Sequence, residues 1–106
     1  MIAPASAKPG DTVEVVTFWV VLSPPQRPLS IMLHLRDVEG VPIAVGDALG
    51  FPVEHWQMGD SFVQRHQISI PLSNEPGKYT IVTNIYWLEN LEPLSPANFA
   101  ETLDIQ

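Results

Sequence analysis

Apolar residues gather in short runs that recur about every ten residues along this chain. Turn-forming residues separate these runs at positions 8–11, 23–25, 37–40 and 74–77. Short runs bounded by Gly, Pro, Asn and Asp predict β-strands. Many such strands at this spacing are typical of an antiparallel sandwich or barrel. The pattern therefore predicts the fold class but gives no information about chemistry.

Residues 29–36 show the alternation of a half-buried strand, because Ile31, Leu33 and Leu35 share one side. The other side of this strand is more polar and consists of Ser30, Met32, His34 and Arg36. We expect the first side to face the core and the second side to face solvent.

Residues 12–22 are apolar on both sides. One side carries Val13, Val15, Trp19 and Val21, and the other carries Val16, Phe18 and Val20. A strand of this kind is either central in its sheet with its outer face covered, or part of an interface. We expect a central strand with Trp19 anchored in the core.

Four further strands are expected at residues 41–47, 62–72, 78–88 and 102–105. Pro42 cannot donate a ladder hydrogen bond, so the strand at 41–47 is expected at a sheet edge. A seventh strand forms if residues 2–5 also pair. Pro or Gly interrupts every candidate helix, so no helix of ordinary length is expected. The prediction is an all-β, immunoglobulin-like antiparallel β-sandwich of six to seven strands.

A chain of 106 residues corresponds to one domain, residues 1–106, and suffices for a core without disulfides. There is no cysteine, which removes thiolate sites and catalytic thiols. No run of eighteen apolar residues is present, so we expect no membrane span. The first eight residues lack a basic segment followed by an apolar stretch, and we expect no signal peptide there.

The formal net charge is −7, with only five Lys plus Arg. Such a field repels polyanions, so no nucleic acid is expected as a partner, and anionic lipid surfaces are disfavoured.

No cofactor, metal or catalytic site is predicted. The three histidines, His34, His55 and His66, show no metal-ligand spacing such as His-x-His, although His34 and His66 could be neighbours across a sheet. The segment at 37–40 lacks the full ligand series of a calcium loop and fits a turn. Neither a nucleophile motif nor a glycine-rich phosphate loop occurs. The chain is therefore not expected to be an enzyme.

The loop at residues 48–60 is longer than a hairpin connection needs, and long loops are often functional. It places Trp56 beside His55, Gln57 and Asp60. An aromatic ring with polar neighbours suits stacking on a sugar and recognition of its hydroxyls. These four residues are the candidate ligand-binding site. The alternative is that Trp56 folds back and closes the end of the core.

Several short motifs together resemble a known group of domains. In order, they are Pro9-Gly10-Asp11-x-Val13-x-Val15-x-x-x-Trp19, His34-Leu35-x-Asp37-x-x-Gly40, Ala44-x-x-Asp47, Trp56-x-x-Gly59, Pro76-Gly77-x-Tyr79 and Ile85-Tyr86. The chain resembles the extracytoplasmic C-terminal β-sandwich domain of bacterial and archaeal glycosyltransferase-like membrane proteins, over residues 4–105. Such domains often have a turn and an Arg-Leu pair after the tyrosine, where this chain has residues 88–94 without arginine.

The resemblance implies an extracytoplasmic location and the rest of a parent membrane protein as partner. It implies no activity. Two hypotheses follow. The chain is a non-catalytic accessory domain that packs against its parent protein or self-associates, or it is a carbohydrate-binding module that uses the loop aromatics. Burial of Trp56 favours the first hypothesis, and exposure favours the second.

Overall fold

The computed structural model describes residues 1–106 and confirms the predicted all-β fold. It contains seven strands and one short 3-10 helix. In chain order they are β1 (Ser6–Ala7), β2 (Thr12–Val20), β3 (Leu29–Arg36), β4 (Pro42–Val45), η1 (Val53–His55), β5 (Ser61–Ser69), β6 (Gly77–Trp87) and β7 (Phe99–Ile105). No helix has the length and apolar character needed to cross a membrane.

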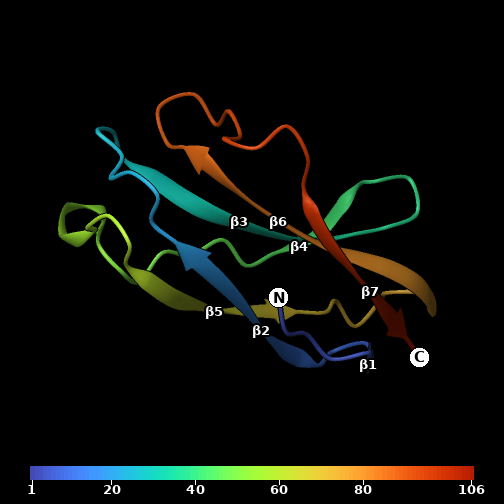
Figure 1. Cartoon of the computed structure of the whole chain (residues 1–106). Helices are drawn as coiled ribbons and strands as arrows, with labels where there is room; N and C mark the ends of the chain where they lie inside the picture. Colours follow the sequence, from blue (N-terminus) through green and yellow to red (C-terminus); the bar gives the residue numbers. More distant parts are fainter.

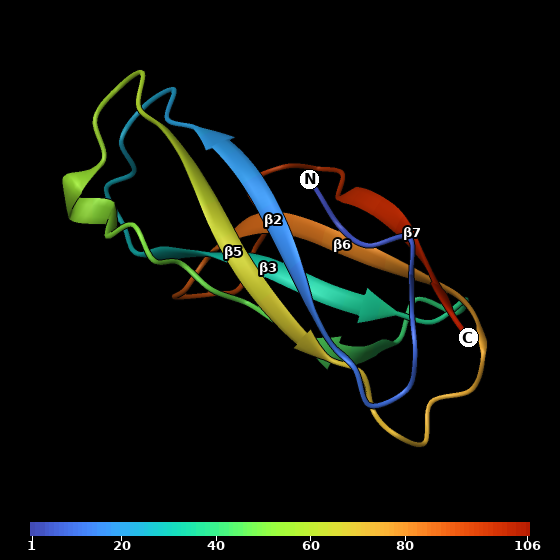
Figure 2. The ribbon, with the colours of Figure 1, turned by 90° about the horizontal axis from the view of Figure 1, so that it is seen from below.

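The strands form two sheets that face each other as a sandwich (Figure 1). The larger sheet has the order β1-β7-β6-β3-β4, and the smaller sheet contains only β2 and β5. Figure 2 shows β2 and β5 crossing over β3 and β6. All pairs are antiparallel except the short β1 with β7, which is parallel. Pro42 begins β4 at a sheet edge, as predicted.

The core lies between the sheets because the alternating apolar residues of each strand point inward. Leu33 and Leu35 of β3 face the smaller sheet, and Val15 and Ile68 are their fully buried counterparts there. Fully burying one such side chain stabilises the fold by about 1.5–3 kcal/mol. The expected inner side of β3 is therefore confirmed, and its side with His34 and Arg36 is the outer surface of the larger sheet.

The position predicted for residues 12–22 is wrong. β2 is not central, because it pairs along one edge with β5 and along the other only through the Ile2–Val16 bridge. Its outer face is not covered either, since Phe18 is 53% exposed and Val20 is 61% exposed. Trp19 lies on the inward-facing side of β2, as expected, and its indole N–H donates to the buried Thr17 hydroxyl. Its side chain is only half-buried, however, so Trp19 is not fully enclosed by the core.

A chain of hydrogen bonds connects the two sheets through a buried histidine. His66 Nε2 lies 3.0 Å from Thr17 Oγ1, and His66 Nδ1 lies 2.8 Å from the Gly46 carbonyl oxygen. A carbonyl only accepts, so Nδ1 carries the proton and Nε2 accepts from the Thr17 hydroxyl. The Trp19 indole N–H donates to the same hydroxyl oxygen at 2.7 Å. His66 is thus structural, and it lies on a different sheet from His34.

Candidate functional site

The predicted loop site is built around a buried tryptophan. Trp56 follows η1, is 8% exposed and packs with Phe51 and Phe62, the latter at a centroid distance of 5.0 Å. Its indole N–H donates to the Phe51 carbonyl oxygen at 2.9 Å. The ring therefore closes the end of the core, as the packing alternative predicts, and only a small part of it is exposed, beside the neighbouring pocket.

The other residues of the predicted site do not gather around Trp56 as a binding surface. His55 and Gln57 are exposed, and neither lines the neighbouring pocket. The Asp60 carboxylate accepts from the Gln57 backbone N–H at 2.9 Å, so it closes a turn at Gly59, where φ is 88°. That conformation is easy for glycine.

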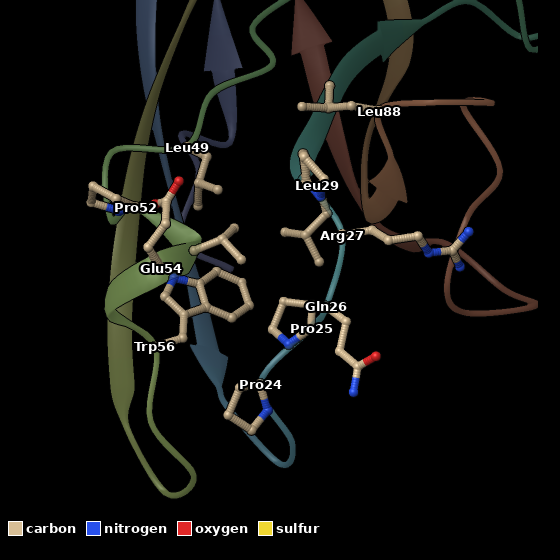
Figure 3. A pocket seen from close by; sticks show the side chains of 12 residues that line it. Pro24, Pro25, Gln26, Arg27, Leu29, Leu49, Pro52, Glu54, Trp56 and Leu88 are labelled. Atoms are coloured by element: carbon tan, nitrogen blue, oxygen red, sulfur yellow. The ribbon is translucent and has the colours of Figure 1, made fainter.

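An open pocket of about 640 Å³ does lie beside Trp56. Figure 3 shows the indole projecting from the loop into a gap whose other wall is the segment with Pro24, Pro25 and Leu29. The Arg27 guanidinium carbon lies 4.3 Å from the centroid of the Trp87 ring, and the guanidinium forms an ion pair with Glu89. Its charge is therefore already paired within the protein. The other polar side chains that line this pocket are Gln26 and Glu54.

A second pocket, of about 480 Å³, lies on the outer face of the larger sheet. Its polar lining comes from the outward positions of β3 and β6 and from the segments that follow β4 and precede β7. The lining residues are Met32, His34, Arg36, Asp47, Asn84, Tyr86, Leu91, Pro93 and Asn98. Sheet register brings them together, because Met32 pairs with Asn84 and Ser30 pairs with Tyr86 on adjacent strands.

Asp47 is fixed at the centre of this outer-face site. Its Oδ1 accepts the Leu33 backbone N–H at 2.8 Å, and its Oδ2 accepts the Tyr86 hydroxyl at 3.0 Å. Burial and the Asp47 contact raise the pKa of Tyr86 above its usual value, so the hydroxyl stays protonated and donates. The carboxylate is thereby oriented before any ligand arrives.

Arg36 is the cation of the site and lies beside His34. Arg36 donates from its terminal nitrogen to His34 Nδ1 at 3.2 Å, so the His34 proton resides on Nε2, which lies 3.7 Å from Asp47 Oδ1. Burial lowers the pKa of His34, and Arg36 lowers it further, whereas Asp47 raises it. His34 is therefore neutral at pH 7. Arg36 forms no ion pair, and its buried Nε has no hydrogen-bond partner.

The segment before β7 borders the site and is held by Asn84. The Asn84 amide donates to the Ser95 carbonyl oxygen at 3.1 Å and to Asn98 Oδ1 at 3.0 Å. Asn84 Oδ1 accepts the Ile85 backbone N–H at 2.8 Å, which fixes the amide orientation. The buried Asn84 thus anchors the segment against the sheet and completes one wall of the pocket.

Sequence reasoning located the polar side of β3 but did not assign it a site. Asp47 and Tyr86 lie in different segments, and only the sheet register and the chain path after β4 place them beside His34. No group of three or more His, Asp or Glu side chains converges in a way that could hold a metal ion.

Neither a protein-family model nor a curated protein sequence matches this chain. The outer-face site is therefore assessed on its own geometry.

Proposed function

We propose that this chain is a non-catalytic accessory domain that binds a carbohydrate at the outer-face site of its larger sheet. The observation that supports this most directly is the fixed Asp47 carboxylate, which accepts from Tyr86 and Leu33 while lining an open pocket. This proposal combines the accessory role of the first sequence hypothesis with the carbohydrate ligand of the second, and it moves the site away from Trp56.

A sugar hydroxyl donates one hydrogen bond and accepts others, so its site needs donors and acceptors close together. The outer-face site has both, because Asp47 and Asn98 supply acceptor oxygens while Arg36 supplies donor nitrogens. The pocket volume of about 480 Å³ falls within the range of small-molecule sites.

The geometry favours binding over catalysis. His34 is the only histidine of the site, and its Nδ1 accepts from Arg36 while its Nε2 faces Asp47. No serine or threonine hydroxyl is hydrogen-bonded to it. An activated nucleophile requires such a pair of hydroxyl and base.

The membrane context is part of the proposal and depends on the sequence resemblance. Three residues of the resembling motifs, His34, Asp47 and Tyr86, meet in the outer-face site. An extracytoplasmic domain of a larger membrane protein would encounter glycans or glycolipid head groups, which is consistent with a carbohydrate ligand.

The test is a titration with a panel of mono- and oligosaccharides, followed by amide NMR shifts. We expect shifts at Leu33, Asp47 and Tyr86 but not around Trp56. Tyr86→Phe removes the hydroxyl that orients Asp47 and should weaken binding about tenfold, the typical effect of one hydrogen bond to a charged group. Tyr79→Phe is the matched control on the same strand, because the Tyr79 hydroxyl donates to Glu75 outside the site.

Shifts confined to the pocket beside Trp56 would place the site at the loop end instead. If no sugar in the panel shifts any amide at millimolar concentration, the carbohydrate proposal is wrong. The accessory role would then depend on packing alone.

A further inference from the structure

We propose that the free edge of β2 pairs with the same edge of a second copy of this chain, joining two small sheets into one. This surface is separate from the carbohydrate site, because it belongs to the smaller sheet. Three observations support it: the other sheet edges are protected, the free part of this edge can pair with itself, and residues 17–23 carry no charge.

Three of the four sheet edges are protected. β1 pairs with β7 only at residues 104–105, and the rest of the β7 edge carries a charged residue, Glu101, on the same side as the core residues Leu103 and Ile105, which discourages strand pairing. β4 is short, begins with Pro42 and has a register shift at Leu35/Arg36. The far edge of β5 is approached by the chain after β4, where Gly46 lies so close that an added Cβ would meet the Gln67 carbonyl oxygen at 2.7 Å. Short strands, proline, bulges and covering segments are the devices by which proteins block edge pairing.

The part of the β2 edge that follows Val16 has none of these devices. The Ile2–Val16 bridge uses both Val16 backbone groups, at 2.8 and 2.9 Å, so even-numbered residues of β2 direct their N–H and C=O groups to this edge. Phe18 and Val20 have the same parity, and no strand pairs with them there. Their backbone groups are therefore available to a partner strand.

The free segment suits antiparallel pairing with itself about a two-fold axis at Trp19. In this register Phe18 lies opposite Val20 of the second copy, and these residues exchange backbone hydrogen bonds. Their side chains share the outer face with Val63, and all three are more than half exposed. An isologous contact thus covers one apolar patch with its own copy.

The charges permit self-pairing despite the net charge of −7. Residues 17–23 contain no charged side chain, so the two edges meet without like charges in contact. The contact is small. Only the short segment from Phe18 to Val20 pairs, so each copy buries well below the roughly 800 Å² per partner of a standard interface. We therefore expect a weak dimer, with a Kd of about 0.1–1 mM.

Sedimentation velocity between about 0.02 and 1 mM protein tests the dimer. The mass should rise with concentration for the parent chain. Val20→Lys should remove this rise, because an edge lysine blocks strand pairing. Val45→Lys is the matched control, since Val45 is 58% exposed on β4, and it should dimerise like the parent. Circular dichroism of both variants checks that the fold is intact.

The register is tested by disulfide trapping, which is clean because the chain has no cysteine. An equal mixture of Phe18→Cys and Val20→Cys chains should form a mixed disulfide at least fivefold faster than either chain alone. Opposite residues lie about 5.5 Å apart, whereas residues of the same number lie about 7–8 Å apart, too far for a bridge. A strictly monomeric parent at 1 mM, or equal trapping in all three samples, overturns the proposal.

Discussion

Replacing His66 with leucine should destabilise the fold because it removes the connection between the two sheets. His66 accepts from Thr17 at 3.0 Å and donates to the Gly46 carbonyl oxygen at 2.8 Å, and the side chain is fully buried. Leucine restores apolar packing but neither hydrogen bond. The Gly46 carbonyl and the Thr17 hydroxyl are then left inside the sandwich without their partner.

Each buried hydrogen bond contributes a net 0.5–1.5 kcal/mol, roughly, and each polar group left unsatisfied costs about 1–3 kcal/mol. We expect His66→Leu to lower the free energy of unfolding by about 3 kcal/mol. Thr17→Val removes the hydroxyl between His66 and Trp19 with little change in shape, and it should cost about 2 kcal/mol. The double variant should cost less than the sum, because the two residues share one bond.

The free energies come from urea unfolding followed by tryptophan fluorescence, and the pH dependence supplies an independent check. Burial lowers the pKa of His66 below the ordinary value of 6.5. As the pH falls, the unfolded chain therefore binds this proton before the folded chain does. The stability that neutral His66 contributes is fully present above pH 6.5, and it is lost as the pH falls from 6.5 to the lowered pKa of the folded state. The cost of His66→Leu should be smaller near pH 5 than near pH 7.5.

Two results would refute this reasoning. A cost below about 0.5 kcal/mol for His66→Leu at neutral pH would mean that the bonds contribute nothing net. Costs in the two single variants that add fully in the double variant would mean that His66 and Thr17 are not coupled.

Two further predictions concern Gly46 and His34. Gly46→Ala should lower the free energy of unfolding by about 1–3 kcal/mol, measured by thermal or urea unfolding, because the new Cβ meets the Gln67 backbone oxygen at 2.7 Å. Gly50→Ala is the control and should be nearly neutral, because its Cβ meets only the flexible Gln64 side chain at 3.4 Å. An NMR titration of the His34 imidazole should give a pKa below 6.5. This pKa should fall further in Asp47→Asn and rise in Arg36→Gln, because Asp47 raises it and Arg36 lowers it. Shifts in the opposite directions would contradict the described site.

The sequence by itself determined the fold class and most strand positions. Alternation in residues 29–36 is a local property, since a strand places successive side chains on opposite faces wherever it lies. The inward side of β3 and the edge position of Pro42 therefore followed from the residues alone. The local pattern also left Trp56 with two alternatives, because a loop aromatic fits either a surface or the end of a core.

Only the tertiary structure decided which strands neighbour each other, and this is where sequence reasoning failed. An apolar strand looks the same whether a neighbour covers it or its edge is free, so β2 was expected at the centre of a sheet although it is an edge strand with Phe18 exposed. The outer-face site was missed for the same reason. His34, Asp47 and Tyr86 are far apart in the chain, and they meet because β3 lies between β4 and β6. Strand order depends on pairing between segments far apart in the chain, and the local alternation of apolar and polar residues contains no information about it.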